Sequence, residues 1–181
     1  MRPILTAALG LTLLAMPLAA CKPAGAPRVS AERNLADGKA FLEANGKKTG
    51  VVTLPSGVQY TVVKSGPATN PKPATRDEVK VHYEGKLLDG KVFDSSYERG
   101  VPASFALNRV IPGWTDALSH MHVGDEWIIY IPSELAYGEH PEQHGADDIP
   151  PNAVLTFRVE LLDVLPAFGP GGDEPPIAPK G

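Results

Sequence analysis

The chain has 181 residues, of which 43% are hydrophobic and 21% charged, and its formal net charge is −4 at pH 7. This length and apolar content suit one globular domain with flanking segments. The acidic balance argues against a nucleic-acid partner, because such a partner requires a basic face.

The N-terminal segment, residues 1–20, is typical of an export signal peptide. It contains Arg2, has no acidic residue, and continues as the apolar run ILTAALGLTLLAMPLAA. A membrane-spanning helix needs about 20 clean apolar residues, whereas Pro17 interrupts this run. We therefore expect an exported protein.

Cys21 is the single cysteine of the chain, so no intramolecular disulfide can form. It ends the tetrapeptide LAAC, which resembles the bacterial lipobox, where the cysteine receives a diacylglyceryl group and becomes the new N-terminus. The alternative is an ordinary signal peptide whose cleavage leaves a free thiol. We expect a periplasmic lipoprotein. Lys22 follows the cysteine, which favours the outer membrane over the inner membrane as the site of the anchor.

The next segments predict a tether and a short helix. Residues 21–29 contain the lipidated cysteine and KPAGAPRV, which has the composition of a tether. Residues 30–50 predict a helix of about sixteen residues, with Ser30 as its N-cap and Gly46 at its end. Its apolar stripe is weak, and Gly38 costs about 1 kcal/mol relative to alanine, so the helix should be marginal alone.

From Val58 onward the hydrophobic period changes to two, which is the pattern of half-buried antiparallel strands. One helix, WTDALSHM, interrupts the strands. We therefore expect an α+β fold in which an antiparallel twisted sheet wraps around one short helix. Residues 51–74 are assigned to a lead-in strand and loop, 75–165 to the main domain, and 166–181 to a disordered tail rich in proline and glycine.

Most familiar catalytic motifs are missing from the sequence. It contains no GxSxG, Walker loop, CxxC or HExxH motif. Ser95 and Ser96 follow Asp94, but their surroundings favour a turn over a catalytic triad. The histidines of HMH and EHPEQH lack a recognised ligand spacing, so solvated loops are favoured over a metal site. No metal or cofactor is expected.

The chain also contains aromatic and branched residues at strand and loop junctions. Each one alone is better explained as core than as part of a site. Asp94, however, directly follows Phe93, and a carboxylate among apolar neighbours needs hydrogen-bond partners.

From about Thr75 to Val164 the chain resembles an FKBP-type peptidyl-prolyl isomerase domain. Four motifs carry the resemblance, in family order and spacing: VHYEGKLLDGKVFDSSYERG, VIPGW, LAYG and IPPNAVLTFRVELLDV. The segment NGKKTGVVTLPSGVQYTVVKSG is similar to the link between the dimerisation helix and catalytic domain of Mip-like members. The helix is short here, so we expect a monomer.

The resemblance implies an apolar pocket whose floor is Trp114 and in which a substrate proline lies on the indole. It implies catalytic roles for Tyr83, Phe93, Asp94 and Tyr137, and substrate contacts from Phe105, Val110, Ile111, Ile149 and Phe157. The backbone N–H of Ile111 and the Tyr137 hydroxyl would donate to substrate carbonyls.

Two departures affect substrate preference: Ala103 replaces a frequent aromatic, and the loop 137–149 is longer than in the smallest members. The implied activity is cis–trans isomerisation of Xaa–Pro bonds in exported polypeptides, with macrolide inhibitors as further ligands. The alternative is a lipid-tethered chaperone or peptide-binding module that uses the same groove without catalysis.

Overall fold

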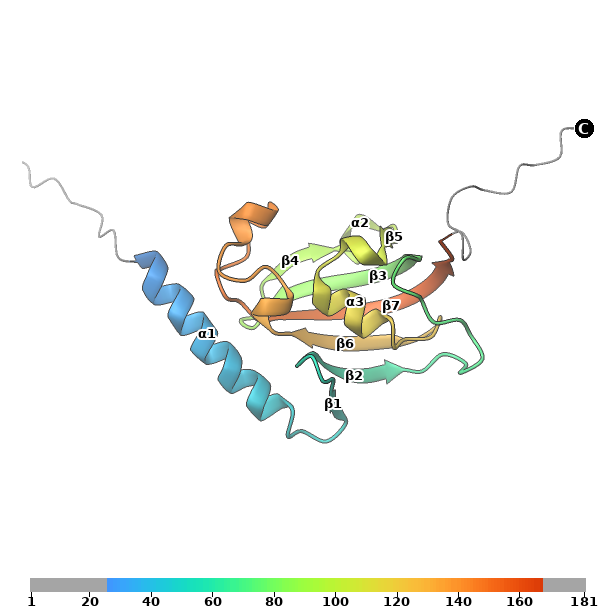
Figure 1. Ribbon diagram of the computed structural model, residues 1–181, viewed down its shortest axis with the longest axis horizontal. Coiled ribbons are helices and arrows are strands. Elements are labelled where there is room, and N and C mark those ends of the chain that lie inside the picture. Colours follow the sequence, from blue (N-terminus) through green and yellow to red (C-terminus); the bar gives the residue numbers. More distant parts are fainter. Residues whose placement is uncertain (1–25, 168–181) are drawn as a thin grey trace, which may run out of the picture.

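The computed structural model describes residues 26–167 (Figure 1). The predicted signal peptide, Cys21 and most of the predicted C-terminal tail lie outside these residues. Within the described part of the chain, no helix combines the length and apolar character needed to cross a membrane.

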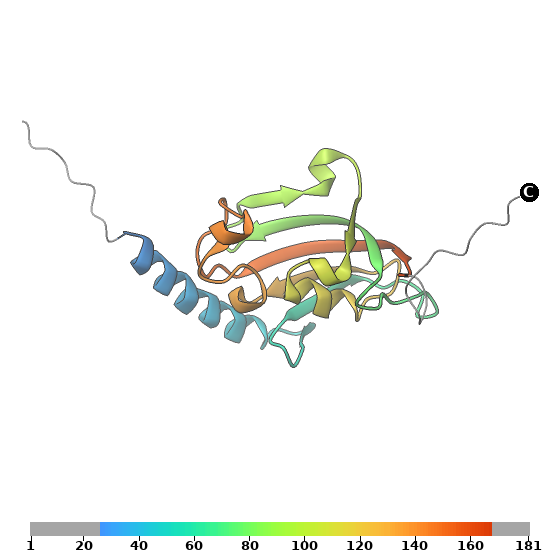
Figure 2. The same ribbon diagram turned by 45° about the horizontal axis from the view of Figure 1, so that its top comes forward.

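The domain is an antiparallel sheet that bends over one helix. Figure 2 shows strands β3 and β7 curving past α3, which confirms the α+β class expected from the sequence. The strand order is β1-β2-β6-β7-β3-β4, and β5 pairs with β3 beside this path. The strands are β1 (Val51–Thr53), β2 (Gln59–Lys64), β3 (Glu78–Leu87), β4 (Val92–Ser95), β5 (Ala103–Ala106), β6 (Glu126–Ile131) and β7 (Leu155–Leu165).

Helix α3 (Pro112–Leu118) lies on the concave face of the sheet and forms the centre of the core. It begins with Pro112, whose fixed φ and missing N–H suit a first turn. Gly113 allows the helix to approach β6, because a Cβ there would lie 2.4 Å from Ile131 Cγ2. Trp114 is thereby held at the start of the helix, against the buried faces of the central strands.

The segment 51–74, which the sequence predicts as a lead-in strand and loop, contributes two strands to the sheet of the domain. Its two strands, β1 and β2, extend the sheet, and β2 pairs with β6 along Gln59–Lys64. The alternation of VQYTVV predicts this strand, but periodicity does not identify its partner β6, which lies far along the chain.

The domain also contains a short helix that the sequence pattern did not predict. This helix, α2 (Ser96–Arg99), follows β4 and is capped by the Ser95 hydroxyl, which accepts from Glu98 N at 3.2 Å. Three short 3-10 turns add further irregular structure: η1 (Leu107–Arg109), η2 (Ser133–Leu135) and η3 (Pro141–His144). Elements of three or four residues contain too few periodic positions to be recognised in a sequence.

The N-terminal helix α1 (Ala26–Asn45) is longer than predicted and begins four residues earlier. Ser30 therefore lies inside the helix and is not its N-cap, and residues 26–29 are helical rather than a tether. Pro27 in the first turn is compatible with this start, since the first helical N–H groups have no partner inside the helix.

The C-terminal half of α1 contacts the outer side of the sheet. The Asn45 amide, 1% exposed, donates to Gln59 Oε1 at 3.0 Å, and Gln59 Nε2 donates to the Leu42 carbonyl at 2.8 Å. The rings of Phe41 and Tyr130 lie 5.7 Å apart. These contacts place α1 beside the domain, as Figures 1 and 2 both show.

Candidate active site

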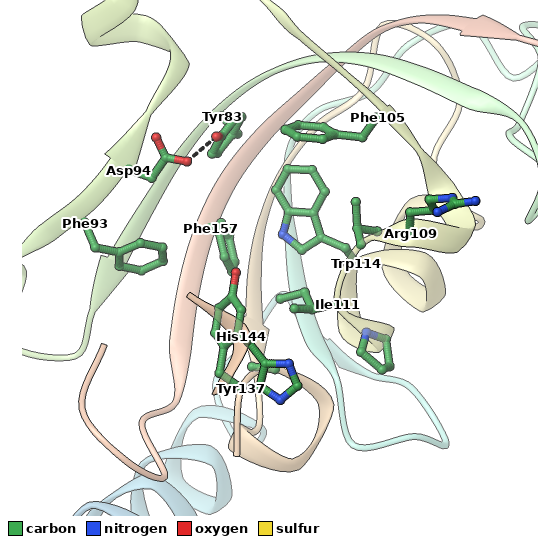
Figure 3. Close-up of a pocket in the computed structure, with 13 residues that line it drawn as sticks. Tyr83, Phe93, Asp94, Phe105, Arg109, Ile111, Trp114, Tyr137, His144 and Phe157 are labelled. Carbon is green, nitrogen blue, oxygen red and sulfur yellow. Dashed lines mark hydrogen bonds between the residues drawn. The ribbon is translucent and has the colours of Figure 1, made fainter. Parts of the chain in front are cut away.

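A cavity of about 500 Å³ opens between the start of α3, strands β3 and β4, and the segment that follows η2 (Figure 3). All of the pocket residues implied by the family resemblance line it, except Ile149. The lining residues are Tyr83, Phe93, Asp94, Phe105, Arg109, Val110, Ile111, Pro112, Trp114, Ala136, Tyr137, His144 and Phe157.

Ile149 does not line the cavity. It is 6% exposed and belongs to the hydrophobic core, where the backbone turns so that its N–H donates to the Ala146 carbonyl at 3.0 Å. The bend in the loop directs this side chain inward, and a bend of this kind could not be derived from the spacing of the motifs.

Trp114 forms the base of the cavity and is 4% exposed. Three rings meet the indole edge-on, at centroid distances of 5.3 Å for Tyr83, 5.6 Å for Phe105 and 5.3 Å for Phe157. Edge-to-face geometry is favourable between aromatic rings, so the indole is held in one orientation. Its buried Nε1 has no hydrogen-bond partner among the described residues.

One wall of the cavity depends on Gly85 in the middle of β3. Gly85 pairs with Asp94 on one side and with Phe157 on the other. A Cβ at this position would lie 2.5 Å from Phe93 Cζ and 2.9 Å from Phe157 Cε1. The missing side chain therefore leaves the space in which these two rings meet, 5.6 Å apart and at 89°.

The polar side of the cavity is a network of three residues. The Tyr83 hydroxyl donates to Asp94 Oδ2, and Arg99 Nη1 donates to Asp94 Oδ1. Arg99 Nη2 also donates to the Tyr83 oxygen at 3.0 Å. The partners that Asp94 was expected to need are thus present. Arg99, which supplies one of them, was not anticipated; its only sequence signal was its position in the same motif, SSYERG.

This network sets the ionisation of its members. Burial raises the pKa of Asp94, but the hydrogen bonds from Tyr83 and Arg99 and the charge of Arg99 together lower it by more, so the net pKa is below its ordinary value. Burial, and then the bond to the Asp94 carboxylate, raise the pKa of Tyr83 above 10.0. Near neutral pH the site therefore contains a carboxylate and a protonated phenol.

The mouth of the cavity is formed by residues from two segments. Figure 3 shows the hydroxyl of Tyr137 directed into the cavity, below Phe157. Burial, and then the negative charge of Asp94, raise the pKa of this phenol, so it remains a donor. Its ring lies 6.2 Å from that of His144. On the other side, Ile111 has an extended backbone, with φ −58° and ψ 145°, directly before α3.

Arg109, Pro112, Ala136 and His144 line the cavity without having been predicted. Arg109 directly precedes the VIPGW motif and Pro112 lies within it, so the motif could have suggested both. Ala136 precedes Tyr137 in LAYG, whereas His144 reaches the cavity only because residues 137–149 turn back across its mouth.

The structure offers no alternative catalytic centre at the serines near Asp94. Ser96 is fully buried, and its hydroxyl accepts from Tyr83 N at 2.8 Å and bonds with His82 Nδ1 at 3.0 Å. Ser95 caps α2. Within residues 26–167, no group of three His, Cys, Asp or Glu side chains is arranged to hold a metal ion.

Residues 69–162 match the family model described as FKBP-type peptidyl-prolyl cis-trans isomerase. Residues 20–62 match a second model, described as the domain amino terminal to FKBP-type peptidyl-prolyl isomerase. Together the two matches cover α1, α3 and most of the sheet.

Relatives of known name are similar over most of this chain. It is 53% identical over 134 residues to the FKBP-type peptidyl-prolyl cis-trans isomerase FkpA of Aeromonas hydrophila, which covers 74% of this chain and 48% of that protein. It is 47% identical over 137 residues to the outer membrane protein MIP of Legionella longbeachae, with 76% and 57% covered. The chain thus spans about half the length of the curated relatives it matches.

Two solved structures are also similar to this chain. The crystal structure of FkpA from Escherichia coli superimposes with a TM-score of 0.71 at 46% identity, covering 77% of this chain and 63% of that one. A peptidyl-prolyl cis-trans isomerase from Pseudomonas syringae superimposes with a TM-score of 0.67 at 38% identity, covering 75% and 96%.

Proposed function

Because this chain belongs to the FKBP-type peptidyl-prolyl cis-trans isomerase family, we propose that it catalyses rotation about Xaa–Pro peptide bonds in polypeptides. The observation that carries the proposal is the apolar cavity of about 500 Å³ with Trp114 at its base. A pyrrolidine ring is flat and apolar, and the indole offers it a matching surface.

Rotation requires no bond to be made or broken. The planar amide is stabilised by resonance, which creates a barrier of about 18–20 kcal/mol, and an Xaa–Pro bond isomerises unaided in tens to hundreds of seconds. The twisted amide is less charge-separated than the planar one. A cavity lined by Phe93, Phe157 and Trp114 therefore favours the twisted form over the planar form.

Polar groups at the cavity would orient the substrate. We assign catalytic roles to Tyr83, Phe93, Asp94 and Tyr137, with the Tyr137 hydroxyl and the backbone N–H of Ile111 as donors to substrate carbonyls. Tyr83 is already engaged with Asp94, so its hydroxyl oxygen and the Asp94 charge contribute a fixed dipole at the edge of the cavity.

The remaining lining residues would make apolar contacts with the substrate. Phe105, on β5, meets the indole edge-on at one wall of the cavity. The proposed substrate contacts are the lining residues Phe105, Val110, Ile111 and Phe157. The neighbouring Ala103 leaves that wall lower than an aromatic residue would. Macrolide inhibitors are proposed as further ligands of the same cavity.

The sequence of the N-terminus supports an exported, lipid-anchored protein. We propose that residues 1–20 are removed and that Cys21 carries the lipid, which would locate the domain in the periplasm. The outer membrane is favoured as the anchor site because Lys22 follows the cysteine. Two or more acyl chains on one cysteine give stable attachment, whereas one chain gives only marginal binding.

We also propose a monomer. Helix α1 uses one face against its own domain, and its outward face is made of exposed residues such as Glu32, Asp37, Lys39 and Glu43. Such a face buries little apolar area in a dimer. Light scattering at micromolar concentration should give the mass of one chain, and twice that mass would contradict the proposal.

The enzyme proposal is tested with the purified protein and a proline-containing tetrapeptide, by measuring the cis–trans exchange rate by NMR. Exchange should accelerate in proportion to protein concentration, and Tyr137→Phe should slow it. Val63→Ala, an exposed change on β2 remote from the cavity, is the control. A protein that binds the peptide without accelerating exchange would be the non-catalytic binding module instead.

A further inference from the structure

Helix α1 contacts the segment that leads from the cavity back to strand β7. We call residues 137–154 the pocket loop, because it begins at Tyr137 and contains His144. Asn34 Nδ2 donates to the Pro151 carbonyl at 2.9 Å, and Asn152 Nδ2 donates to the Ala31 carbonyl at 3.3 Å. Helix α1 therefore donates one hydrogen bond to the pocket loop and accepts one from it.

A close approach of glycine and valine completes this contact. A Cβ on Gly38 would lie 2.7 Å from Val154 Cγ2, and Val154 is 4% exposed. Ala31, Asn34 and Gly38 share one face of α1, since they are three and seven residues apart. Glycine inside a helix costs about 1 kcal/mol relative to alanine. Its presence here is explained by the valine that occupies the space of the missing side chain.

Asn152 connects this contact to the cavity. It has a φ of 56°, the only positive φ at a non-glycine residue in the described part of the chain, and asparagine adopts this region more readily than most residues. Its side chain bonds to α1, while its backbone N–H donates to the Gly138 carbonyl at 2.8 Å. Gly138 directly follows Tyr137. Asn152 therefore links α1 to the backbone next to Tyr137 through two hydrogen bonds.

We propose that α1 positions Tyr137 for catalysis, with Asn34 and Gly38 as positioning residues that act through the pocket loop. A loop of this length samples many arrangements unless its backbone is held, and a donor is effective only when it stays at the substrate carbonyl. The helix holds the far end of the loop, and Asn152 transmits this restraint to Gly138. The proposal rests on the proposed function for its effect on turnover, but not for its effect on the loop.

The test uses the full-length protein and two single variants. Asn34→Ala removes the bond to Pro151, and Gly38→Ala places a methyl group against Val154. Both should speed hydrogen exchange of the Asn152 and Gly138 amides. Each should also lower kcat/KM for a proline tetrapeptide by about 2- to 10-fold, the effect of losing one ordinary hydrogen bond.

Rescue and control variants separate positioning from general damage. Val154→Ala removes Cγ2 and leaves Cβ, which would lie 3.8 Å from a Cβ on Gly38, an ordinary contact distance. The double variant Gly38→Ala with Val154→Ala should therefore show slower amide hydrogen exchange and a higher kcat/KM than Gly38→Ala alone. Ala40→Leu adds bulk to the exposed face of the same helix and should change neither.

Unchanged amide exchange in both single variants would overturn the proposal, as would faster exchange with unchanged turnover. If the wild-type protein does not accelerate isomerisation at all, the proposed function fails. In that event the exchange rates still show whether α1 holds the loop.

Discussion

The Tyr83 hydroxyl and the Arg99 guanidinium both donate to the carboxylate of Asp94, one to each oxygen. Asp94 therefore accepts at both oxygens, and this arrangement distinguishes two substitutions at this position. Asp94→Asn keeps one carbonyl oxygen for Tyr83 or Arg99 and should retain turnover within about threefold. Asp94→Leu leaves the hydroxyl of the buried Tyr83 without its acceptor and should lower turnover about tenfold.

Initial rates at fixed peptide concentration measure the two Asp94 variants against the wild type. Circular dichroism of each variant verifies that the sheet is retained. Equal losses in both variants would mean that the negative charge, rather than the hydrogen bonding, is what the site needs.

The pH dependence of turnover follows from the same network. The pKa of Asp94 is lowered, so it stays ionised above its ordinary value near 3.9, and the raised pKa values of Tyr83 and Tyr137 keep both phenols protonated. The rate should therefore be nearly flat from about pH 6 to 8.5, which brackets most of the ordinary titration range of histidine. A bell-shaped profile that disappears on replacing His82, His140 or His144 would instead indicate acid–base catalysis.

Stability should change with pH at the acidic end. Because folding lowers the Asp94 pKa, this group stabilises the fold above its unfolded pKa near 3.9, and the contribution is lost as the pH falls through the lower folded value. Urea unfolding of wild type and Asp94→Asn at pH 7 and pH 3 measures this effect. The two proteins should differ more at pH 7, and an equal difference at both pH values would contradict the linkage.

Replacement of Trp114 should reduce substrate contact. Trp114→Ala removes a large buried ring, which in a core commonly costs about 3–5 kcal/mol of stability, so its loss of turnover is hard to interpret alone. Trp114→Phe is milder. The indole Nε1 has no hydrogen-bond partner among the described residues, so its removal leaves no acceptor there unpaired. It should raise KM several-fold while the protein stays folded.

Trp127 provides the matched control for Trp114. It is 5% exposed, its Nε1 likewise lacks a partner within residues 26–167, and it stacks on Tyr60 at 4.0 Å, away from the cavity lining. Trp127→Phe should lower stability and leave KM unchanged. If both phenylalanine variants raise KM alike, contact with the indole of Trp114 is not what binds the substrate.

The cavity should require glycine at position 85, because any side chain there would displace the rings of Phe93 and Phe157. Gly85→Ala places a methyl group within 3 Å of both Phe93 and Phe157, so the two rings must separate. Turnover should fall about tenfold or more, with a stability loss of about 1–3 kcal/mol that is typical of overpacking. Lys80→Ala, an exposed change on the same strand, is the control. Wild-type turnover in Gly85→Ala would show that the Phe93–Phe157 contact is dispensable.

The lipid anchor is tested at Cys21. Cys21→Ser removes the thiol that would be acylated, so the protein should move from the membrane fraction to the soluble fraction of the bacterial envelope. The intact mass of the wild type should include the acyl groups. A wild-type protein that is soluble and carries no added mass would contradict the anchor.

Much of the fold is determined by local patterns in the sequence. Alternating positions in VKVHY and EWIIYI must place one set of side chains in the core, and Trp114, Ala117 and Leu118 share one face of a helix whatever surrounds it. The family resemblance carried by the short motifs likewise implied most of the residues that line the cavity.

The tertiary structure alone decided where the motifs meet and what else joins them. Arg99 reaches Tyr83 and Asp94 because α2 turns back beside β3, and Ile149 enters the core because its loop bends. Gly38 appeared to be only a weak helix position until Val154 was found against it. The physical reason is common to all three: periodicity reports which side of its own element a residue occupies, whereas contacts between separate elements depend on how those elements pack against each other.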